Sequence, residues 1–451
     1  MGIKGKAMRF TANGWYKVAL LIIIILPFAR CAPVKQVPPR PSNIVLYKTV
    51  AFHADFDSGN LETVEAIDAH QFLIKPRPDY GKDDLLSRLY LGPLETPWNG
   101  RTWWYHFSVS IPERHLPYAI RLHIDRSREF GSSAYASDKV PVTSCDGKAW
   151  RYVRKWKVNA ESSTITETLT CPRTYFALAT PYPWAQMEHY IRHLETAPHV
   201  KTHDVFAHTP LGVNQDSLPL YYLLITDGTS PHSKRNIVVV SGQHPGEVAN
   251  AWMVRGMITF LLSEGDIAHA LRQHFAFHIY PAVNPEGVKY GYYRRSADSP
   301  LNPNRAWGSD KLMEIKTVRE HILMQTGGTV DYFFDLHGSM RHAHFIYYFV
   351  DQPCAAAYVD AVHRRYAAVS NHSQGGIKHK FTCYDAFAYR WAMKHLRTSR
   401  SRDEPPLSFT PEGAYTQGSW DNPPQQMMEV MAAGAALLKA IYDVDLYLPR
   451  N

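Results

Sequence analysis

From about residue 179 onward, short apolar runs alternate with segments in which apolar residues recur at helical spacing. A short apolar run bounded by turn residues is typical of a buried strand, and strand–helix alternation favours an α/β domain with a mostly parallel or mixed sheet. Helices then cover both faces of the sheet, and functional groups lie at its strand ends. The predicted strands are Leu220–Ile225, Ile237–Val240, Phe275–Ile279, Val330–Leu336, His344–Phe349 and Leu407–Thr410. The predicted helices are Val248–Ser263, Lys311–Gln325, Ala355–Ala368 and Gln425–Tyr442, and the segment Ala179–Ala197 before them also has helical spacing.

The chain before residue 179 has a different pattern. Thr102–Ile111, Ala119–Asp125 and Thr164–Cys171 alternate apolar and polar residues, as strands with one buried face do. We therefore expect an all-β sandwich over residues 43–178, followed by a catalytic domain over residues 179–451. With 451 residues, of which 45% are hydrophobic, the chain can build a separate core in each domain.

The N-terminus carries a basic stretch and then the apolar run Val18–Ala29. A dozen apolar residues match a secretory signal better than a membrane-spanning helix, which needs about 20. Cys31 follows as in a lipoprotein cleavage site, although Arg30 stands where a small residue is expected. The sequence thus predicts a signal segment over residues 1–31 and a Pro-rich linker over residues 32–42. The protein would be exported, and either periplasmic or membrane-anchored on the outer side of the inner membrane, with a lipoprotein as one option.

The net charge of +8 gives no argument for binding nucleic acid, because five basic residues and no acidic ones fall within residues 1–30. The spacing of Cys145, Cys171, Cys354 and Cys383 fits no zinc-binding cysteine pattern. An oxidising compartment would allow the bridges Cys145–Cys171 or Cys354–Cys383, and unpaired buried thiols are the alternative.

The apolar run Ile237–Val240 leads into a turn that holds His244 and Glu247, with Pro245 and Gly246 between them. Imidazole nitrogen and carboxylate oxygen are both normal zinc ligands, so one interpretation is a metal site at a strand-to-helix junction. The other is a turn histidine followed by an acid that favours a helix N-terminus. An isolated His-x-x-Glu pair does not decide between them.

A second predicted strand, in "DYFFDLHGS", ends at His337. Two histidines at the ends of two strands of one sheet can converge, and with Glu247 they would supply the three protein ligands of an open catalytic zinc site. Asp335 lies two residues before His337 and therefore on the same strand face. It either orients a ligand histidine or caps the next turn.

Two further groups could complete such a site. Glu412 follows a predicted strand and could be the base that takes a proton from water, although taken alone it is a loop acid. Asn304 and Arg305 lie in a polar loop, where arginine offers a planar fork for a carboxylate and asparagine a directional donor. Arg294 or Arg295 could add a contact or polarise a scissile carbonyl. The alternative is a basic loop that pairs with acids of its own domain.

The order of these motifs resembles the zinc metallocarboxypeptidases. His244-x-x-Glu247 is followed by "NPEGV", "YYRRS", "NPNRAW", "FDLHG" and "SFTPE". The resemblance is greatest to the cytosolic-carboxypeptidase-like branch, whose members carry a β-sandwich before the peptidase domain, and "FHADFDSGNLE", "ALATPYPW" and "LLITD" fit that arrangement. It covers roughly residues 48–440.

This resemblance implies one zinc ion per chain, bound by His244, Glu247 and His337. Glu412 would be the general base that activates the water and later delivers a proton to the leaving amine. Arg294 would assist the carbonyl oxygen of the scissile bond.

The resemblance also implies that Asn304 and Arg305 hold the terminal carboxylate of the substrate. Their motif "NPNR" departs from the Asp-Leu-Asn-Arg sequence usual in the branch, and the doubled arginine at 294–295 leaves the register open by one residue. The tyrosine that many members carry on a mobile loop has two candidates here, Tyr384 and Tyr389.

The segment Thr382–Pro406 diverges from the family pattern and lies where side-chain specificity would be set. Its arginines Arg397, Arg400 and Arg402 could select an acidic terminal residue, as in the deglutamylating branch. A solvated basic loop is the preferred interpretation, since charge runs are usually solvated.

The sequence therefore predicts an exported zinc metallocarboxypeptidase that hydrolyses C-terminal residues of peptides or proteins, using zinc-activated water and a glutamate base. An alternative keeps the zinc site but uses cell-wall stem peptides (muropeptides) or small N-acyl amino acids as substrates. A non-catalytic peptide binder is a third hypothesis, against which the intact ligand set and Glu412 argue. The residue removed and the oligomeric state are left open.

Overall fold

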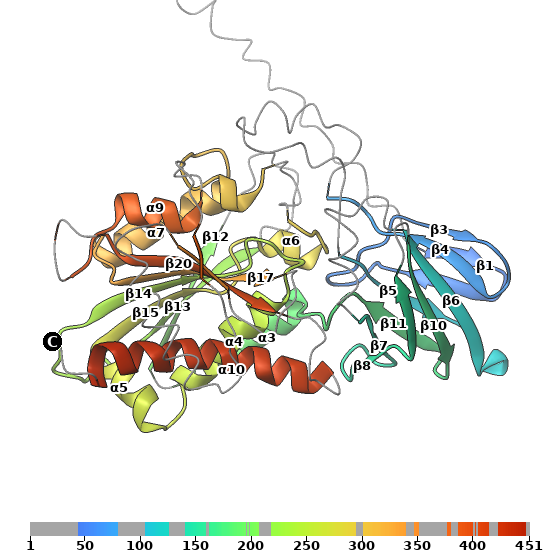
Figure 1. The fold of residues 1–451 in the computed structure, drawn as a ribbon, viewed down its shortest axis with the longest axis horizontal. Helices are drawn as coiled ribbons and strands as arrows, with labels where there is room; N and C mark the ends of the chain where they lie inside the picture. The colour runs from blue at the N-terminus through green and yellow to red at the C-terminus, as the bar shows by residue number, and fades with distance from the viewer. Residues whose placement is uncertain are drawn as a thin grey trace, which may run out of the picture.

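The structure, a computed structural model, describes residues 44–79, 104–125, 140–158, 162–194, 196–197, 199–206, 218–294, 301–339, 347–350, 377–379, 387–399, 402, 405–414 and 423–447. Figure 1 shows two units that follow one another along the chain. The first is built almost wholly of strands, and in the second helices lie around a central sheet.

The strand-rich unit consists of two sheets around a shared core. Buried and half-buried residues alternate along the whole of β10, which is the period-two pattern of a strand with one covered face. One sheet has the order β1 Ile44–Tyr47, β2 Val50–His53, β5 His106–Ser110, β11 Arg173–Ala177, β7 Val142–Ser144 and β8 Arg151–Tyr152. The other has the order β3 Thr63–Ala66, β4 Gln71–Lys75, β6 Tyr118–Asp125, β10 Ser162–Leu169 and β9 Lys155–Val158. Among the described residues, Phe52, Phe72, Phe107, Leu122 and Phe176 belong to the core of this unit.

The second unit has a mixed central sheet. Its order is β12 Val200–Phe206, β13 Pro219–Ile225, β15 Phe275–Tyr280, β14 Arg235–Val240, β16 Tyr332–Asp335, β20 Leu407–Ala414, β18 Tyr347–Val350 and β19 Ile377–His379, with β17 His337–Ser339 beside β20. The central strands β15, β14, β16 and β20 pair in parallel, whereas β12 with β13, β13 with β15 and β18 with β20 are antiparallel. Parallel neighbours bring their carboxyl ends to one edge of the sheet.

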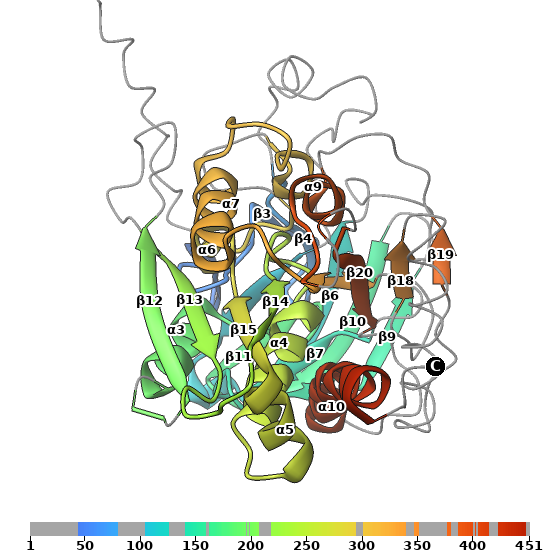
Figure 2. The same ribbon diagram turned by 90° about the vertical axis from the view of Figure 1, so that its left-hand side faces the viewer.

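Helices cover both faces of this sheet, which explains its continuous apolar strands. Ile237 and Val239 of β14 belong to the core beneath α3 Trp184–Leu194, α4 Ala249–Leu261, α5 Asp266–His274 and α10 Pro423–Tyr442. Val238 and Val240 belong instead to the core beneath α7 Met313–Thr326 and α9 Ala388–His395. Figure 2 shows the two helix groups on opposite sides of the strands.

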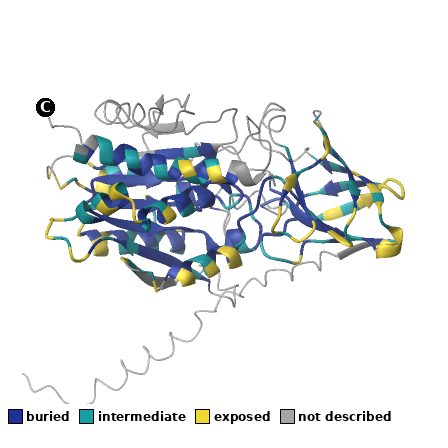
Figure 3. Cartoon of the chain, turned by 90° about the horizontal axis from the view of Figure 1, so that it is seen from below, coloured by how far each residue is buried: buried dark blue, intermediate teal, exposed yellow. Residues whose placement is uncertain are grey.

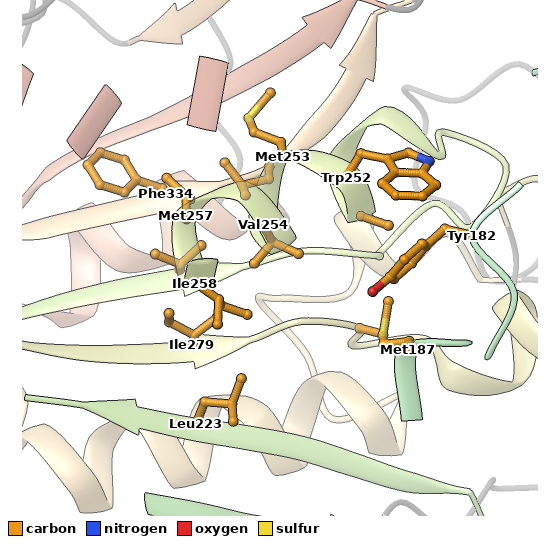
Figure 4. Packing of buried hydrophobic residues seen from close by; sticks show 14 of the residues in the cluster. Tyr182, Met187, Leu223, Trp252, Met253, Val254, Met257, Ile258, Ile279 and Phe334 are labelled. Carbon is orange, nitrogen blue, oxygen red and sulfur yellow. The ribbon is translucent and has the colours of Figure 1, made fainter. Parts of the chain in front are cut away.

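Helix α4 lies between the sheet and α10. Figure 4 shows Met253, Met257 and Ile258 of α4 in the same apolar cluster as Ile279 of β15. A Cβ on Gly256 would overlap the backbone of α10, and this glycine therefore lets the two helices approach closely. Figure 3 shows the whole chain coloured by burial, with exposed residues on outer helix surfaces and at turns of the strand-rich unit.

The predicted fold class, a mixed-sheet α/β domain after a strand-rich domain, is confirmed. The sequence did not predict β12, whose "VKTHDVF" is polar because it is the edge strand, or α5, whose nine residues are too few for a periodic signal. Residues 344–346 and the helix predicted at 355–368 lie outside the described residues, as do residues 1–43. Within the described residues, no helix is both long and apolar enough to cross a membrane.

Candidate metal centre and active site

The turn between β14 and α4 places the first two candidate ligands. Gly242 has a positive φ of 71°, and a Cβ there would lie 2.9 Å from the Cα of Ala282, so only glycine fits this bend. The backbone N–H of Glu247 donates to the carbonyl of His244 at 3.1 Å, which closes the turn. Glu247 therefore lies two residues before the helix, which begins at Ala249.

The third candidate ligand reaches the same place from the neighbouring strand. Asp335 at the end of β16 is the register partner of Val240 at the end of β14, so the two strands end together. The next short strand, β17, begins at His337 and pairs in parallel with β20. Its first register pair is His337 with Glu412, which brings the candidate base to the candidate metal site.

His244, Glu247 and His337 form one buried group. Nδ1 of His244 lies 2.9 Å from Oε1 of Glu247, and Nδ1 of His337 lies 2.9 Å from Oε2. Each residue offers a ligand atom within 4.8 Å of those of the other two. Two imidazoles and one carboxylate are the donor set of many catalytic zinc sites.

The second nitrogen of His244 is held by an amide. Its Nε2 donates to Oδ1 of Asn302 at 2.9 Å, and that oxygen also accepts the backbone N–H of Asn304 at 2.9 Å. The Nδ1 lone pair of a neutral His244 then points at the carboxylate of Glu247. Acceptor atoms gathered at this distance suit a cation, and the three side chains therefore fit a zinc ion.

The second nitrogen of His337 is held by a carboxylate. Its Nε2 lies 3.1 Å from Oδ1 of Asp335, which is fully buried. Gln243 donates to the same oxygen through its amide and accepts the indole N–H of Trp307 at 2.7 Å. Of the two roles open for Asp335, the structure favours orientation of the histidine.

These partners set the charges of the three groups. Burial lowers the pKa of His244 to about 4, although Glu247 opposes this. Burial acts in the same direction on His337, but the carboxylates of Asp335 and Glu247 outweigh it and raise the pKa to about 10. Burial would raise the pKa of Glu247, yet the two histidines hold it well below its usual value. Glu247 is therefore an anion at neutral pH.

Arg294 is the arginine that reaches this group. Its Nη2 lies 3.4 Å from Oε1 of Glu247. Arg295 lies outside the described residues. Arg294 therefore reaches the candidate site, and the choice between the two registers of the doubled arginine stays a prediction.

The polar pair Asn304–Arg305 lies beside the same group, in η3 Pro303–Arg305. Nδ2 of Asn304 lies 2.9 Å from Nε2 of His337, and its Oδ1 accepts the backbone N–H of Ala388 at 3.0 Å. The guanidinium of Arg305 lies 3.9 Å from the ring centroid of Phe387. Both side chains are thus fixed by neighbours near His337.

Two of the remaining candidates that the structure describes lie on and just after α9. Tyr389 is buried at the start of α9, and Tyr384 lies outside the described residues. Arg397 donates to the carbonyls of Met393, Lys394 and Leu396 at the end of α9, which favours its structural interpretation. In the strand-rich unit, Cys145 and Cys171 form a disulfide, as one of the two predicted pairings has it. Arg400, Cys354 and Cys383 lie outside the described residues.

Sequence reasoning missed Asn302 and Gln243. Both lie within two residues of a predicted site residue, but an asparagine or a glutamine does not by itself indicate catalysis. Asn302 sits two residues before Asn304, and Gln243 immediately before His244. Only the folded arrangement shows that each holds a candidate ligand or its partner.

The fold has close counterparts among solved structures. A metallo-carboxypeptidase from Burkholderia cenocepacia aligns with a TM-score of 0.73 at 19% identity, covering 89% of this chain and 100% of its own. One from Pseudomonas aeruginosa aligns with a TM-score of 0.70 at 20% identity, covering 87% and 99%. At these identities the likeness shows that the two structures share their fold with this chain.

Sequence comparison gives the family. Residues 187–412 match the family of the zinc carboxypeptidases, and residues 52–178 match the cytosolic carboxypeptidase N-terminal domain. The chain therefore belongs to the zinc carboxypeptidase family, as the order of its motifs predicts. The predictions of a zinc metallopeptidase and of the cytosolic-carboxypeptidase-like branch are confirmed.

Individual relatives agree with this assignment. Cytosolic carboxypeptidase 2 of Danio rerio is 31% identical over 283 residues, which are 57% of this chain and 36% of that protein. Cytosolic carboxypeptidase 3 of Mus musculus is 27% identical over 282 residues, which are 57% of this chain and 26% of that protein. The matched regions are thus well under half of the length of these two relatives.

The prediction of an exported, periplasmic or membrane-anchored protein is wrong. It is contradicted by the relatives named as cytosolic carboxypeptidases and by the match of residues 52–178 to the N-terminal domain of that group. The prediction rested on a basic stretch and a dozen apolar residues at the N-terminus. Such a pattern depends on composition alone and is less specific than a match that extends over a folded domain.

Proposed function

We propose that this protein is a zinc-dependent carboxypeptidase that hydrolyses the last peptide bond of peptides or proteins. The observation that carries the proposal is the convergence of His244, Glu247 and His337 at one sheet edge, with Glu412 in register with His337. Membership of the zinc carboxypeptidase family supports a C-terminal substrate and does not favour the muropeptide or N-acyl amino acid alternatives. We also propose the domain division 43–178 and 179–451.

In this proposal His244, Glu247 and His337 hold one zinc ion per chain. Bound zinc would supply Lewis acidity at the reacting carbonyl and water. The chain supplies the orientation of the ligands, because Asn302 and Asp335 fix the two imidazole rings from behind. All three proposed ligands are buried, and their positions are therefore fixed by the surrounding chain.

Glu412 is the proposed general base. It is half-buried in β20 and in register with His337, and in this proposal its carboxylate faces the attacking water. It takes a proton from that water and passes it to the nitrogen of the leaving amine, so the proton is conserved through the reaction. Arg294, next to Glu247, donates to the carbonyl oxygen as negative charge develops on it.

Arg305 and Asn304 are the proposed anchors for the terminal carboxylate of the substrate. The guanidinium of Arg305 lies against the ring of Phe387, and one of its N–H groups donates to the carbonyl of Asn304 at 2.8 Å. This leaves the guanidinium oriented before substrate arrives. A planar fork in a fixed position selects a free C-terminus over an internal peptide bond.

The test is digestion of a C-terminal peptide library, read by mass spectrometry, with and without a chelator. We expect removal of C-terminal residues that stops when the metal is removed and returns with zinc. Glu412→Gln should retain zinc and lose about 10²–10⁴-fold in kcat. Arg305→Ala should raise KM for peptides with a free C-terminus and leave zinc content unchanged. Full activity of the Glu412→Gln protein with zinc bound would exclude Glu412 as the base.

A further inference from the structure

Asp79 of the strand-rich unit makes contacts that the proposed chemistry does not use. Its side chain is buried, with a residue exposure of 7%. Oδ1 accepts the backbone N–H of Tyr293 at 2.6 Å, and Oδ2 accepts the backbone N–H of Arg294 at 2.7 Å. A buried carboxylate costs free energy unless it is hydrogen-bonded, and these charge-assisted bonds to backbone are strong ones.

The strand-rich unit holds the preceding residues of the same loop as well. The backbone N–H of Ser58 donates to the carbonyl of Lys289 at 2.7 Å, and the amide of Asn60 donates to the carbonyl of Gly291 at 2.8 Å. Gly291 has a φ of 68°, and a Cβ there would overlap the carbonyl oxygen of Gly59. The backbones of the two units therefore touch at this point.

The same loop contacts the turn that carries the metal ligands. The carbonyl of Tyr293 accepts the backbone N–H of Gly246 at 2.9 Å. A Cβ on Gly246 would overlap the ring of Tyr293 and lie 3.2 Å from the Cβ of Trp104, a residue of the strand-rich unit. The turn holding Glu247 is thus enclosed between the loop and the strand-rich unit.

Together, these contacts connect Asp79 of the strand-rich unit, through Arg294, to Glu247 of the candidate metal group. Asp79 fixes the backbone of Arg294, and the side chain of Arg294 reaches Glu247 at 3.4 Å. A displacement of about 1 Å in a group that acts on the reacting carbonyl can cost about 10²-fold in rate. Loss of Asp79 would leave two buried N–H groups without their acceptors and free the loop to move.

We propose that Asp79 is a positioning residue, through which the strand-rich domain sets the place of Arg294 in the active site. This rests on the role proposed above for Arg294. The strand-rich domain then contributes to the rate of the reaction, in addition to any contribution to stability. It acts through backbone geometry, because Asp79 binds the N–H groups of the loop.

The test compares Asp79→Asn with Asp57→Asn in the full chain. Asp57 is a matched control, because its carboxylate accepts two backbone N–H groups of α3, from Trp184 at 3.1 Å and Ala185 at 2.6 Å. We expect Asp79→Asn to lower kcat about 10–100-fold with unchanged zinc content. Asp57→Asn should lower the melting temperature and leave kcat near that of the wild type.

A double-mutant cycle separates positioning from general damage. In the Arg294→Ala background, Asp79→Asn should cause no further loss of kcat, because the group it positions is gone. An equal fractional loss with and without Arg294 would overturn the proposal, as would a loss of kcat in Asp57→Asn that matches the loss in Asp79→Asn. If Asp79→Asn does not fold, Asp79→Glu, which keeps the charge and lengthens the side chain, takes its place in the cycle.

Amide hydrogen exchange gives a readout that does not depend on activity. At least one of the amides of Tyr293 and Arg294 should lose protection in Asp79→Asn, because the asparagine side chain has a single acceptor oxygen, and both should keep it in Asp57→Asn. Protection retained at both amides in Asp79→Asn overturns the positioning role. If the wild type cleaves no C-terminal peptide, the proposed function fails, and exchange at these two amides still decides whether Asp79 holds the loop.

Discussion

Each unit of the protein contains a fully buried histidine, and the two have opposite acid–base behaviour. In the strand-rich unit, burial lowers the pKa of His106 to about 3, and Nδ1 of this residue faces the hydroxyl of Ser58 at 2.9 Å. In the candidate metal centre, His337 is equally buried, yet the carboxylates of Asp335 and Glu247 raise its pKa to about 10. The difference lies in the partners, because burial acts in the same direction on both.

His244 lies between these extremes. It faces the carboxylate of Glu247 on one side and only the neutral amide of Asn302 on the other, and its pKa is lowered to about 4. Among these three histidines, the number of neighbouring carboxylates distinguishes His106 of the strand-rich unit from the two proposed metal ligands. It also makes the two histidines of the metal centre unequal.

The largest expected effect comes from making the partner of His337 neutral. Asp335→Asn should weaken zinc binding about 10–100-fold, because the ring loses the carboxylate that orients it and raises its basicity. Isothermal titration with zinc measures the change. Ser108→Ala, at a buried position in the strand-rich unit, is the control and should bind zinc as the wild type does. Unchanged affinity in Asp335→Asn would contradict the prediction, because the charge of Asp335 would then contribute nothing to zinc binding.

A second prediction concerns acid and the histidine of the strand-rich unit. The pKa of His106 is about 3 in the folded chain and about 6.5 when unfolded, so between these values the unfolded state binds more protons. Above pH 6.5 both states are neutral, and as pH falls from 6.5 toward 3 the free energy of unfolding should decrease by up to about 1.4 kcal/mol per pH unit from this group.

The measurement is urea unfolding at a series of pH values for the wild type and His106→Gln. The stability advantage of the wild type should shrink steadily as the solution is acidified, because glutamine does not titrate. Other buried histidines, such as His278 with a pKa of about 4, contribute equally to both proteins. Stability curves that run parallel between pH 6.5 and 4 would contradict the prediction.

The smallest expected effect comes from giving His244 the partner that His337 has. Asn302→Asp should tighten zinc binding by less than about tenfold, since an oriented ring gains only basicity. The amide nitrogen of Asn302 is buried and lacks a partner among the described residues, so an oxygen in its place removes an unpaired donor. Without metal, the added buried charge near Glu247 should lower the melting temperature. Zinc titration measures the affinity of Asn302→Asp, and thermal unfolding without metal measures its melting temperature. Weaker zinc binding than in the wild type would contradict the prediction.

Much of the fold could be predicted from the sequence, because its central strands are apolar on both faces and its sandwich strands alternate. Ile237–Val240 is an example of the first and β10 of the second. Both patterns are local and follow directly from burial. The polar edge strand β12 could not be found in this way, because its stability comes from pairing with β13.

The candidate site was predictable where chemistry restricts the residue type. Histidines and acids at strand ends pointed to the metal group, and the structure brings His244, Glu247 and His337 together. The partners behind them could not be predicted, because an asparagine or a glutamine has no distinctive spacing. Asp79 is more remote still, since it lies more than 200 residues before the loop that it holds.

The contact between Gly59 and Gly291 has a consequence for motion. Backbone meets backbone there, and the neighbouring hydrogen bonds of Ser58 and Asp79 to the loop would all have to break if one unit rotated on the other. These contacts between the two units therefore oppose a hinge motion of one unit relative to the other. We therefore expect any closure around a substrate to come from side chains or from loops within one unit.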